Sequence, residues 1–311
     1  MRPLFGYHLP SFTFPGVAPA ALFEHVVGLA RRAEDAGFDL VTVMDHFYQI
    51  SGVGPEEAPM LEAYSTLAGI AARTSRIRLG ALVTGVTYRN PALLAKTVTT
   101  LDVISGGRAI LGMGAAWNES EHRGYGFDFP RVGERMDRLD EALTICRRMF
   151  TEERPTFEGR FYRVDAALNQ PRPLQAGGPP ILVGGGGEQR TLRLVARHAD
   201  FAHWFPLGMD VLRHKAELLE RYCDDIGRDP ATITRMMAAP VLLVADEREG
   251  EARLAHIPPE RRGALVPATP ARAAELIQEY VDAGFGGFTF GNTMLPGESL
   301  DLAAELIRSF A

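Results

Sequence analysis

An adjacent carboxylic acid and imidazole, Asp45 and His46, follow the apolar run from Leu40 to Met44. Burying either group in such a setting is costly unless it is paired or used. An imidazole titrates near neutral pH and can donate or accept a proton. The pair therefore predicts a site in which His46 is the catalytic acid or base. In the alternative interpretation, Asp45 only caps the next loop and His46 is merely exposed.

Four consecutive glycines, 184–187, stand between an apolar run and an expected helix at 188–198. Glycines let the backbone fold tightly and present its N–H groups, and a helix N-terminus adds about half a positive charge. This pattern predicts a phosphate-binding turn, to which Arg190 could add a cation. The spacing fits neither a Rossmann fingerprint nor a P-loop, which would also need a lysine. A merely flexible turn is the alternative.

A third candidate region follows the small residues Gly112 and Gly114, which leave room for a flat ligand. Beside them, the indole of Trp117 could stack on such a ligand or wall its pocket. Glu121 and His122 are expected to form a charge pair at the start of a helix. The polar residues of the preceding loop, taken alone, are interpreted as ordinary loop residues: Thr84, Thr87, Tyr88 and Asn90.

Short β-rich runs alternate with longer amphipathic runs along the chain. Strands are expected at 4–9, 40–47, 76–85, 108–115, 179–185, 200–205, 235–245 and 286–291, with a hairpin at 155–164. Helices are expected at 19–36, 60–74, from 91, and at 131–150, 188–198, 209–227, 270–284 and 299–310. The strands are mostly continuous apolar runs, which is typical of strands buried on both faces. The eight units predict a single-domain α/β fold over 1–311, a (β/α)8 TIM barrel, rather than a doubly wound sheet.

In such a barrel the C-terminal ends of the strands and the loops that follow them form the active site. This rule selects the Asp45–His46 pair, the end of the third strand and the glycine turn. It also makes five residues candidates for the substrate pocket: His8, Trp117, Asn118, His203 and Trp204. An insertion at 246–269 is expected to border the same mouth.

The composition, with 46% hydrophobic and 23% charged residues among 311, is that of a soluble globular protein. A net charge of −6 with dispersed basic residues argues against nucleic-acid and anionic-membrane partners. No apolar run approaches the roughly 20 residues of a membrane helix, and the N-terminus does not read as a signal peptide. Cys146 and Cys223 lack metal-site spacing and fit two unpaired thiols in a reducing compartment. We therefore expect a cytoplasmic protein without a bound metal.

These segments resemble the luciferase-like superfamily, and in particular its actinobacterial branch of coenzyme F420-dependent oxidoreductases. The resemblance spans nearly the whole chain in the family's order. The most specific segments are TSRIRLGALVTGVTYRNP and SGGRAILGMGAAW with the downstream YGFDFP; AEDAGFDLVTVMDHF, ILVGGGGEQRTLRLVARHAD and YVDAGFGGFTF add to it.

The resemblance implies a role for several positions. His46 matches a histidine that acts as an acid or base close to the cofactor in relatives. Leu82 and Val83 match a strand bulge that commonly holds a non-proline cis peptide behind the cofactor ring. The residues expected to bind the cofactor are Asp45, Leu82, Val83, Thr84, Gly185, Gly186, Gly187, Gln189 and Arg190.

Two departures from the family pattern concern the substrate. Sugar-phosphate dehydrogenase relatives use a glutamate after the fourth strand as proton donor, where this chain has Trp117. This difference argues against glucose-6-phosphate dehydrogenase activity. Relatives often have an asparagine near the end of the sixth strand, where His203 and Trp204 stand here.

The leading hypothesis is an F420-dependent oxidoreductase that transfers a hydride between C5 of the deazaflavin and an unidentified small organic substrate, with a homodimer expected from the family. The alternative in the same fold is an FMN-dependent monooxygenase that uses O2 and a partner flavin reductase. A cofactor-independent lyase acting on a sugar phosphate and a non-catalytic F420 carrier belong to other classes. The carrier would need the glycine turn but not Asp45 and His46.

Overall fold

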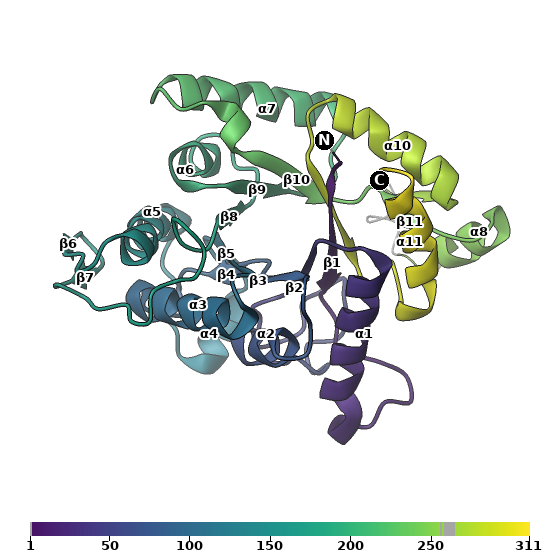
Figure 1. Ribbon diagram of the computed structural model, residues 1–311, viewed down its shortest axis with the longest axis horizontal. Helices are drawn as coiled ribbons and strands as arrows, with labels where there is room; N and C mark the ends of the chain where they lie inside the picture. Colours follow the sequence, from purple (N-terminus) through teal and green to yellow (C-terminus); the bar gives the residue numbers. More distant parts are fainter. Residues whose placement is uncertain (1, 256, 258–264) are drawn as a thin grey trace.

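The computed structural model describes residues 2–255, 257 and 265–311, and eight parallel strands of this part form a closed barrel (Figure 1). Hydrogen bonds between β3 and β5 complete the closure. The barrel strands are β1 (Leu4–Leu9), β2 (Leu40–Val43), β3 (Arg78–Ala81) continued by β4 (Thr84–Gly85), β5 (Ala109–Gly114), β8 (Ile181–Gly184), β9 (Phe201–Trp204), β10 (Thr234–Ala238) and β13 (Gly287–Gly291). The expected (β/α)8 barrel is confirmed.

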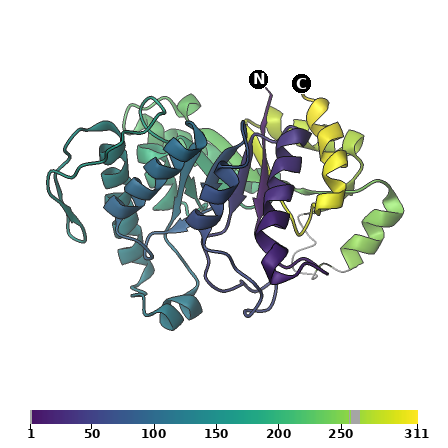
Figure 2. The same ribbon diagram turned by 60° about the horizontal axis from the view of Figure 1, so that its bottom comes forward.

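Helices cover the outside of the barrel, and both chain ends lie close together (Figure 2). Local signals fix the ends of these helices. At the start of α3, Asn90 precedes Pro91, and its side chain accepts hydrogen bonds from two backbone N–H groups of the first turn. The helix ends at Gly106, which has a φ of 70°. The covering helices are α1 (Leu22–Ala36), α2 (Ala63–Ala71), α3 (Pro91–Ser105), α5 (Val132–Thr151), α6 (Thr191–His198), α7 (Met209–Asp224), α10 (Pro270–Asp282) and α11 (Leu300–Arg308). Short 3-10 turns are η1 (Pro19–Ala21), η2 (Pro230–Thr232) and η3 (Gly297–Ser299).

The barrel interior changes from apolar to polar along the strands. Its lower layer, near the N-terminal ends of the strands, packs Leu4, Leu40, Ile110, Leu182, Phe201 and Met236 together, and Leu82 and Val83 pack against this layer from the side of the mouth. Because strand residues two apart face the same side, His203 shares the inward face of Phe201. His8 and Thr42 are register partners on neighbouring strands, and their side chains join by a hydrogen bond. The polar layer therefore lies toward the C-terminal ends.

Several expected elements differ from those observed. The single strand expected at 235–245 is wrong, because Pro240 cannot donate to a ladder and the chain leaves the barrel there. Beyond it, β11 (Val241–Leu243) pairs with β12 (Val266–Ala268) in a separate sheet. The helix α4 (Glu119–Tyr125) was expected only as a helix start at Glu121 and His122, without bounds, and α8 (Glu247–Ala255) was not predicted. The hairpin is confirmed, with β6 (Phe157–Glu158) antiparallel to β7 (Arg163–Val164) beside α5 (Figure 1).

The insertion expected at 246–269 contains α8 and β12, while residues 256 and 258–264 lie outside the described residues. Arg253 on α8 donates to the carbonyl oxygens of Leu243 and Met294, which ties this helix to the segment after β13. Across the described chain, no helix is long and apolar enough to cross a membrane. In the same residues, no His, Cys, Asp and Glu side chains gather as metal ligands would, and Cys146 and Cys223 are buried, free thiols.

Candidate active site

Three consecutive residues after β4 organise the mouth of the barrel. Each contacts a side chain from another segment of the chain, which is either the loop after β2 or helix α4. Arg89 binds Asp45 at 2.6 and 3.0 Å, the Tyr88 hydroxyl donates to Glu121 at 2.5 Å, and the Thr87 hydroxyl meets Nε2 of His122 at 2.6 Å. The loop after β4 therefore joins two other segments, the loop after β2 and helix α4, into one site.

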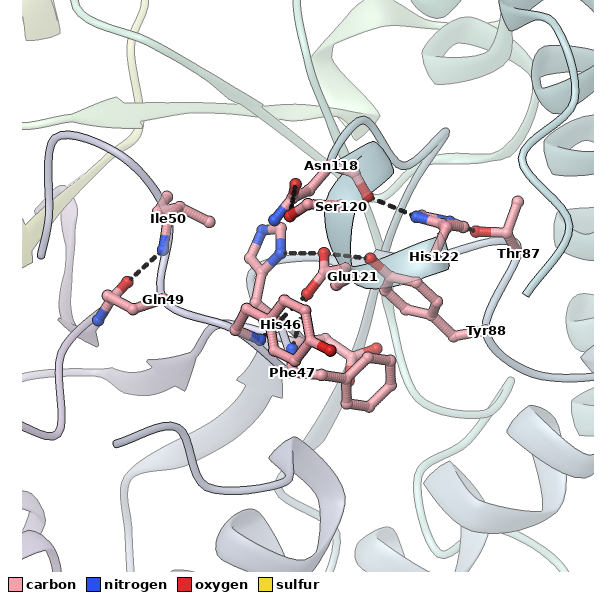
Figure 3. A network of polar contacts seen from close by, with 12 residues as sticks. His46, Phe47, Gln49, Ile50, Thr87, Tyr88, Asn118, Ser120, Glu121 and His122 are labelled. Carbon is pink, nitrogen blue, oxygen red and sulfur yellow. Dashed lines mark hydrogen bonds and ion pairs between the residues drawn. The ribbon is translucent and has the colours of Figure 1, made fainter. Parts of the chain in front are cut away.

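His46 forms its closest polar contact with Glu121, a fully buried carboxylate on α4 (Figure 3). Nδ1 of His46 lies 2.6 Å from Oε1 of Glu121, while Oε2 accepts the backbone N–H of Phe47 at 2.8 Å. A carboxylate only accepts hydrogen bonds, so the proton of a neutral His46 belongs on Nδ1. Nε2 is then the nitrogen that can exchange a proton with a ligand.

The surroundings of Glu121 favour its charged form. Burial raises the pKa of this carboxyl, but the hydrogen bonds from His46, Tyr88 and the Phe47 N–H outweigh burial and leave the pKa below its ordinary value. The expectation that Glu121 and His122 form a charge pair at a helix start is wrong. Both are fully buried; Nδ1 of His122 donates to the Asn118 carbonyl, and its Nε2 lies beside the Thr87 hydroxyl.

Asp45 lies behind His46 and is already paired. Its side chain is 1% exposed, both of its oxygens contact Arg89, and the same guanidinium reaches Glu62 at 2.7 Å. Arg89 also lies over the ring of Tyr64, 4.9 Å from its centroid. Asp45 therefore holds the strand end and the following loop in place, and its carboxylate is turned toward Arg89. The sequence did not single out Arg89, since one arginine in a polar loop is ordinary.

The peptide bond between Leu82 and Val83 is cis, as the resemblance implied. Val83 packs against two glycines at neighbouring strand ends: a Cβ atom on Gly114 or Gly184 would come within 2.8 or 2.9 Å of its methyl groups. Thr84 departs from its expected cofactor contact, because its side chain is fully buried and its hydroxyl lies 2.6 Å from that of Tyr64. Only the backbone of Thr84 could face a ligand.

The glycine turn leaves a series of backbone donors open. Gly185 adopts a φ of 110°, which favours glycine, and its N–H donates to the His203 carbonyl. Among the described residues, the N–H groups of residues 186–190 have no hydrogen-bond partner. They precede the first turn of α6, where the helix dipole adds positive potential. The arrangement suits an anion such as a phosphate.

The charged residues around this turn differ from the expected set. Arg190 is exposed and directed to α5, where it pairs with Asp137 and the Gly133 carbonyl, so its guanidinium does not face the turn. Gln189 is exposed. The buried cation is Lys215 of α7, whose Nζ donates to the Gly186 carbonyl at 2.7 Å and to Glu188 at 3.0 Å. A lysine at one position of an amphipathic helix gives no signal of this contact.

His8 and His203 form the polar layer inside the barrel. Nδ1 of His8 lies 2.9 Å from the Thr42 hydroxyl, and Nε2 of His203 lies 2.8 Å from the Thr289 hydroxyl. Burial lowers the pKa of His8 to about 4 and that of His203 to about 3. Both imidazoles are therefore uncharged at neutral pH, and each keeps one ring nitrogen for another partner.

Two further pocket candidates lie at the mouth and one does not. The Trp117 indole is 56% exposed and packs edge-on against His46, with ring centroids 5.5 Å apart. Asn118 precedes α4, and its side chain accepts from the Ser120 hydroxyl (Figure 3). Trp204 was expected to line the pocket, but its side chain is 1% exposed and packs on Phe285 between barrel and helices. Strand alternation explains this, since its neighbour His203 takes the inward face.

The model of the luciferase-like monooxygenase family matches residues 4–261. The chain belongs to this family. An F420-dependent glucose-6-phosphate dehydrogenase of Intrasporangium calvum is 35% identical over 306 residues, covering 86% of this chain and 87% of that protein. A protein of the same name from Kineococcus radiotolerans is 34% identical over 310 residues, with coverages of 88% and 87%.

Solved structures share the fold of this chain. An F420-dependent secondary alcohol dehydrogenase, in complex with an F420–acetone adduct, has a TM-score of 0.82 at 20% identity and covers both chains fully. The EDTA monooxygenase of Chelativorans has a TM-score of 0.86 at 17% identity, covering 99% of this chain and 94% of its own. At these identities the likeness concerns the fold alone.

Proposed function

We propose that this luciferase-like protein is an F420-dependent oxidoreductase that transfers a hydride between the cofactor and a small organic substrate bearing a hydroxyl or carbonyl group. The observation that carries the proposal is the His46–Glu121 pair at the barrel mouth, opposite open N–H groups on the glycine turn. The F420-dependent relatives, which match most of the chain, support the choice of cofactor.

The residues present fit a ring cofactor that carries a phosphate. The open N–H groups of residues 186–190 would hold the phosphate. Lys215 would keep the turn in place through its hydrogen bond to the Gly186 carbonyl. The half-buried bulge at Leu82 and Val83 would support the ring. Bound F420 would supply C5 of its deazaflavin as the donor or acceptor of the hydride.

The protein's own contribution is to hold one proton at a defined atom. Glu121 fixes Nδ1–H of His46, which leaves Nε2 to take a proton from a substrate hydroxyl or to return one to a carbonyl. When Nε2 gains a proton, the adjacent carboxylate stabilises the imidazolium that forms. Trp117 packs on the imidazole and limits the access of water to it.

The interior of the mouth favours recognition of uncharged groups. His8 and His203 are neutral, and neutral imidazoles exchange hydrogen bonds with hydroxyl or carbonyl oxygens without requiring a charge. Two cations that reach the site, Arg89 and Lys215, are already paired with carboxylates. We therefore propose a hydroxyl-bearing or carbonyl-bearing carbon as the point of reaction, with no substrate phosphate needed.

The cofactor assignment can be tested by binding. Purified protein is titrated with F420 and with FMN, and both are followed by quenching of cofactor fluorescence. Tight binding of F420 with weak binding of FMN is expected. The opposite order, together with O2 consumption in the presence of a flavin reductase, would establish the monooxygenase alternative.

The chemistry can be tested with matched substrates. Glucose-6-phosphate, glucose and a panel of secondary alcohols are offered with oxidised F420, and the loss of its visible absorbance is recorded. We expect turnover of an uncharged substrate at least as fast as that of glucose-6-phosphate. The H46A variant should retain F420 binding and lose turnover; equal losses of both would refute the assigned role of His46.

A further inference from the structure

A second cavity opens at the other end of the barrel, at the N-terminal ends of the strands, where both chain ends lie (Figure 2). Its volume is about 370 Å³, within the range of small-molecule pockets in proteins. Its apolar floor consists of Leu4, Leu40, Ile110, Leu182, Phe201 and Met236. These side chains form the lower interior layer, so the floor is part of the rigid barrel.

Arg78 lines this cavity from the first position of β3. Its register partner is Leu40, and Gly80 and Leu82 follow at the same inward-facing spacing, so Arg78 belongs to the lowest interior position of its strand. The side chain is half-buried. Within residues 2–255, 257 and 265–311, its guanidinium has no hydrogen-bond or ion-pair partner. Five N–H donors therefore stand beside an apolar floor with no acceptor.

The other charged residues of the cavity are engaged. Oε1 of Glu34 accepts three backbone N–H groups, from residues 75–77. Asp39 accepts two bonds from Arg2 and the N–H of Phe5. Arg76 lies at the rim with a 70% exposed side chain, in reach of Asp35 and the Glu34 carbonyl. Among the charged residues that line this cavity, Arg78 is thus the one whose side chain has no partner in the described part of the chain.

We propose that this cavity is a binding site for a small carboxylate with a short apolar tail. The carboxylate would receive paired N–H groups from Arg78, a geometry that suits a guanidinium, and the tail would cover the apolar floor. The site is separate from the mouth at the C-terminal ends of the strands. Carboxylate binding at this site does not depend on which cofactor and substrate the mouth takes.

The test uses the full chain and three six-carbon probes: hexanoate, 1-hexanol and hexylamine. Protein labelled with ¹³C at the methionine methyl groups is titrated, and the Met236 resonance is assigned by its loss in M236L. Hexanoate should shift the Met236 resonance saturably at millimolar concentration. Hexanol should bind at least about tenfold more weakly than hexanoate, since it lacks the charge-assisted contact. Hexylamine should not bind.

Two matched variants complete the experiment. R78Q should weaken hexanoate binding by about tenfold or more, while R76Q, at the exposed rim, should leave it unchanged. Because Arg78 has no partner in the described chain, R78Q should also keep the thermal midpoint of the wild type. The proposal is overturned if hexanoate leaves Met236 unshifted, if it binds R78Q as tightly as the wild type, or if R78Q lowers the midpoint as the loss of a structural partner would.

Discussion

Replacing Glu121 by glutamine tests whether this carboxylate fixes the proton of the His46 ring on Nδ1. The substitution keeps the shape of the side chain and removes its charge. In the wild type, the two oxygens accept from His46 at 2.6 Å, from Tyr88 at 2.5 Å and from the Phe47 N–H at 2.8 Å. An amide has one accepting oxygen, so it cannot satisfy all three donors.

The magnitude follows from the two orientations of the amide. With its oxygen toward His46, its NH2 group faces the Phe47 N–H, and an unsatisfied buried donor costs about 1–3 kcal/mol. With its oxygen toward Phe47, the NH2 group donates to Nδ1 of His46 and moves the imidazole proton to Nε2, which can then no longer accept. Either orientation removes the charge that stabilises the imidazolium. We expect hydride transfer to slow by about 10²–10⁴-fold, the contribution of a positioned acid or base.

Stopped-flow absorbance of F420 under single-turnover conditions measures this rate. The dissociation constant of F420, from fluorescence quenching, should change by less than about threefold, or under about 0.7 kcal/mol. H122Q is the matched control, because His122 is an equally buried neighbour on α4 that does not contact His46. The reasoning is refuted if E121Q retains its rate within about tenfold, or if H122Q loses as much.

Three further outcomes are expected. R89M should leave Asp45 as an unpaired buried charge and lower the free energy of unfolding by about 3–5 kcal/mol in urea titrations. The double variant D45N/R89M should recover part of this loss. An unchanged stability of R89M would contradict the pairing. G185A should weaken F420 binding by about tenfold or more in fluorescence titrations, because a φ of 110° is strained for alanine; wild-type affinity would show that the turn is not the phosphate site. Burial holds the pKa of His8 near 4 and that of His203 near 3, so the unfolded chain, with histidine pKa values of about 6.5, binds more protons below that pH. Stability from these groups should be complete above about pH 6.5 and lost as the pH falls toward 4 for His8 and toward 3 for His203. H8Q/H203Q should show a flatter pH dependence of its urea midpoint.

The barrel could be predicted because its signal is repeated and local. Each strand run is apolar and each helix run amphipathic, so eight weak indications support one another. The strand prediction was wrong at 235–245, because the apolar run continues past the end of the barrel strand. Hydrophobicity alone does not show that the strand ends at Pro240. The extent of α4 was not predicted because the helix has only seven residues and two glycines at its end.

The site could be predicted only where one segment carries its own signal. Asp45 and His46 stand out because a charged pair interrupts an apolar run. Glu121 gave no such signal, since its contact with His46 joins residues 75 positions apart. Lys215 and Arg89 also contact partners far away in the sequence, at separations of 29 and 44 positions. Such pairings are set by the closure of the barrel, which a single sequence does not encode locally.

The three consecutive residues after β4 have a consequence for how this enzyme can be changed. Thr87, Tyr88 and Arg89 each hold a side chain from elsewhere, so inserting or deleting one residue in this loop would shift all three pairings at once. A chimera that takes this loop from a homologue should therefore also take that homologue's partner segments. His8 and His203 lie on separate strands outside this arrangement. On the proposed function they face the substrate, and we propose them as the positions at which substrate preference can be redesigned, or can diverge during evolution, while the residues proposed to transfer the proton are inherited intact.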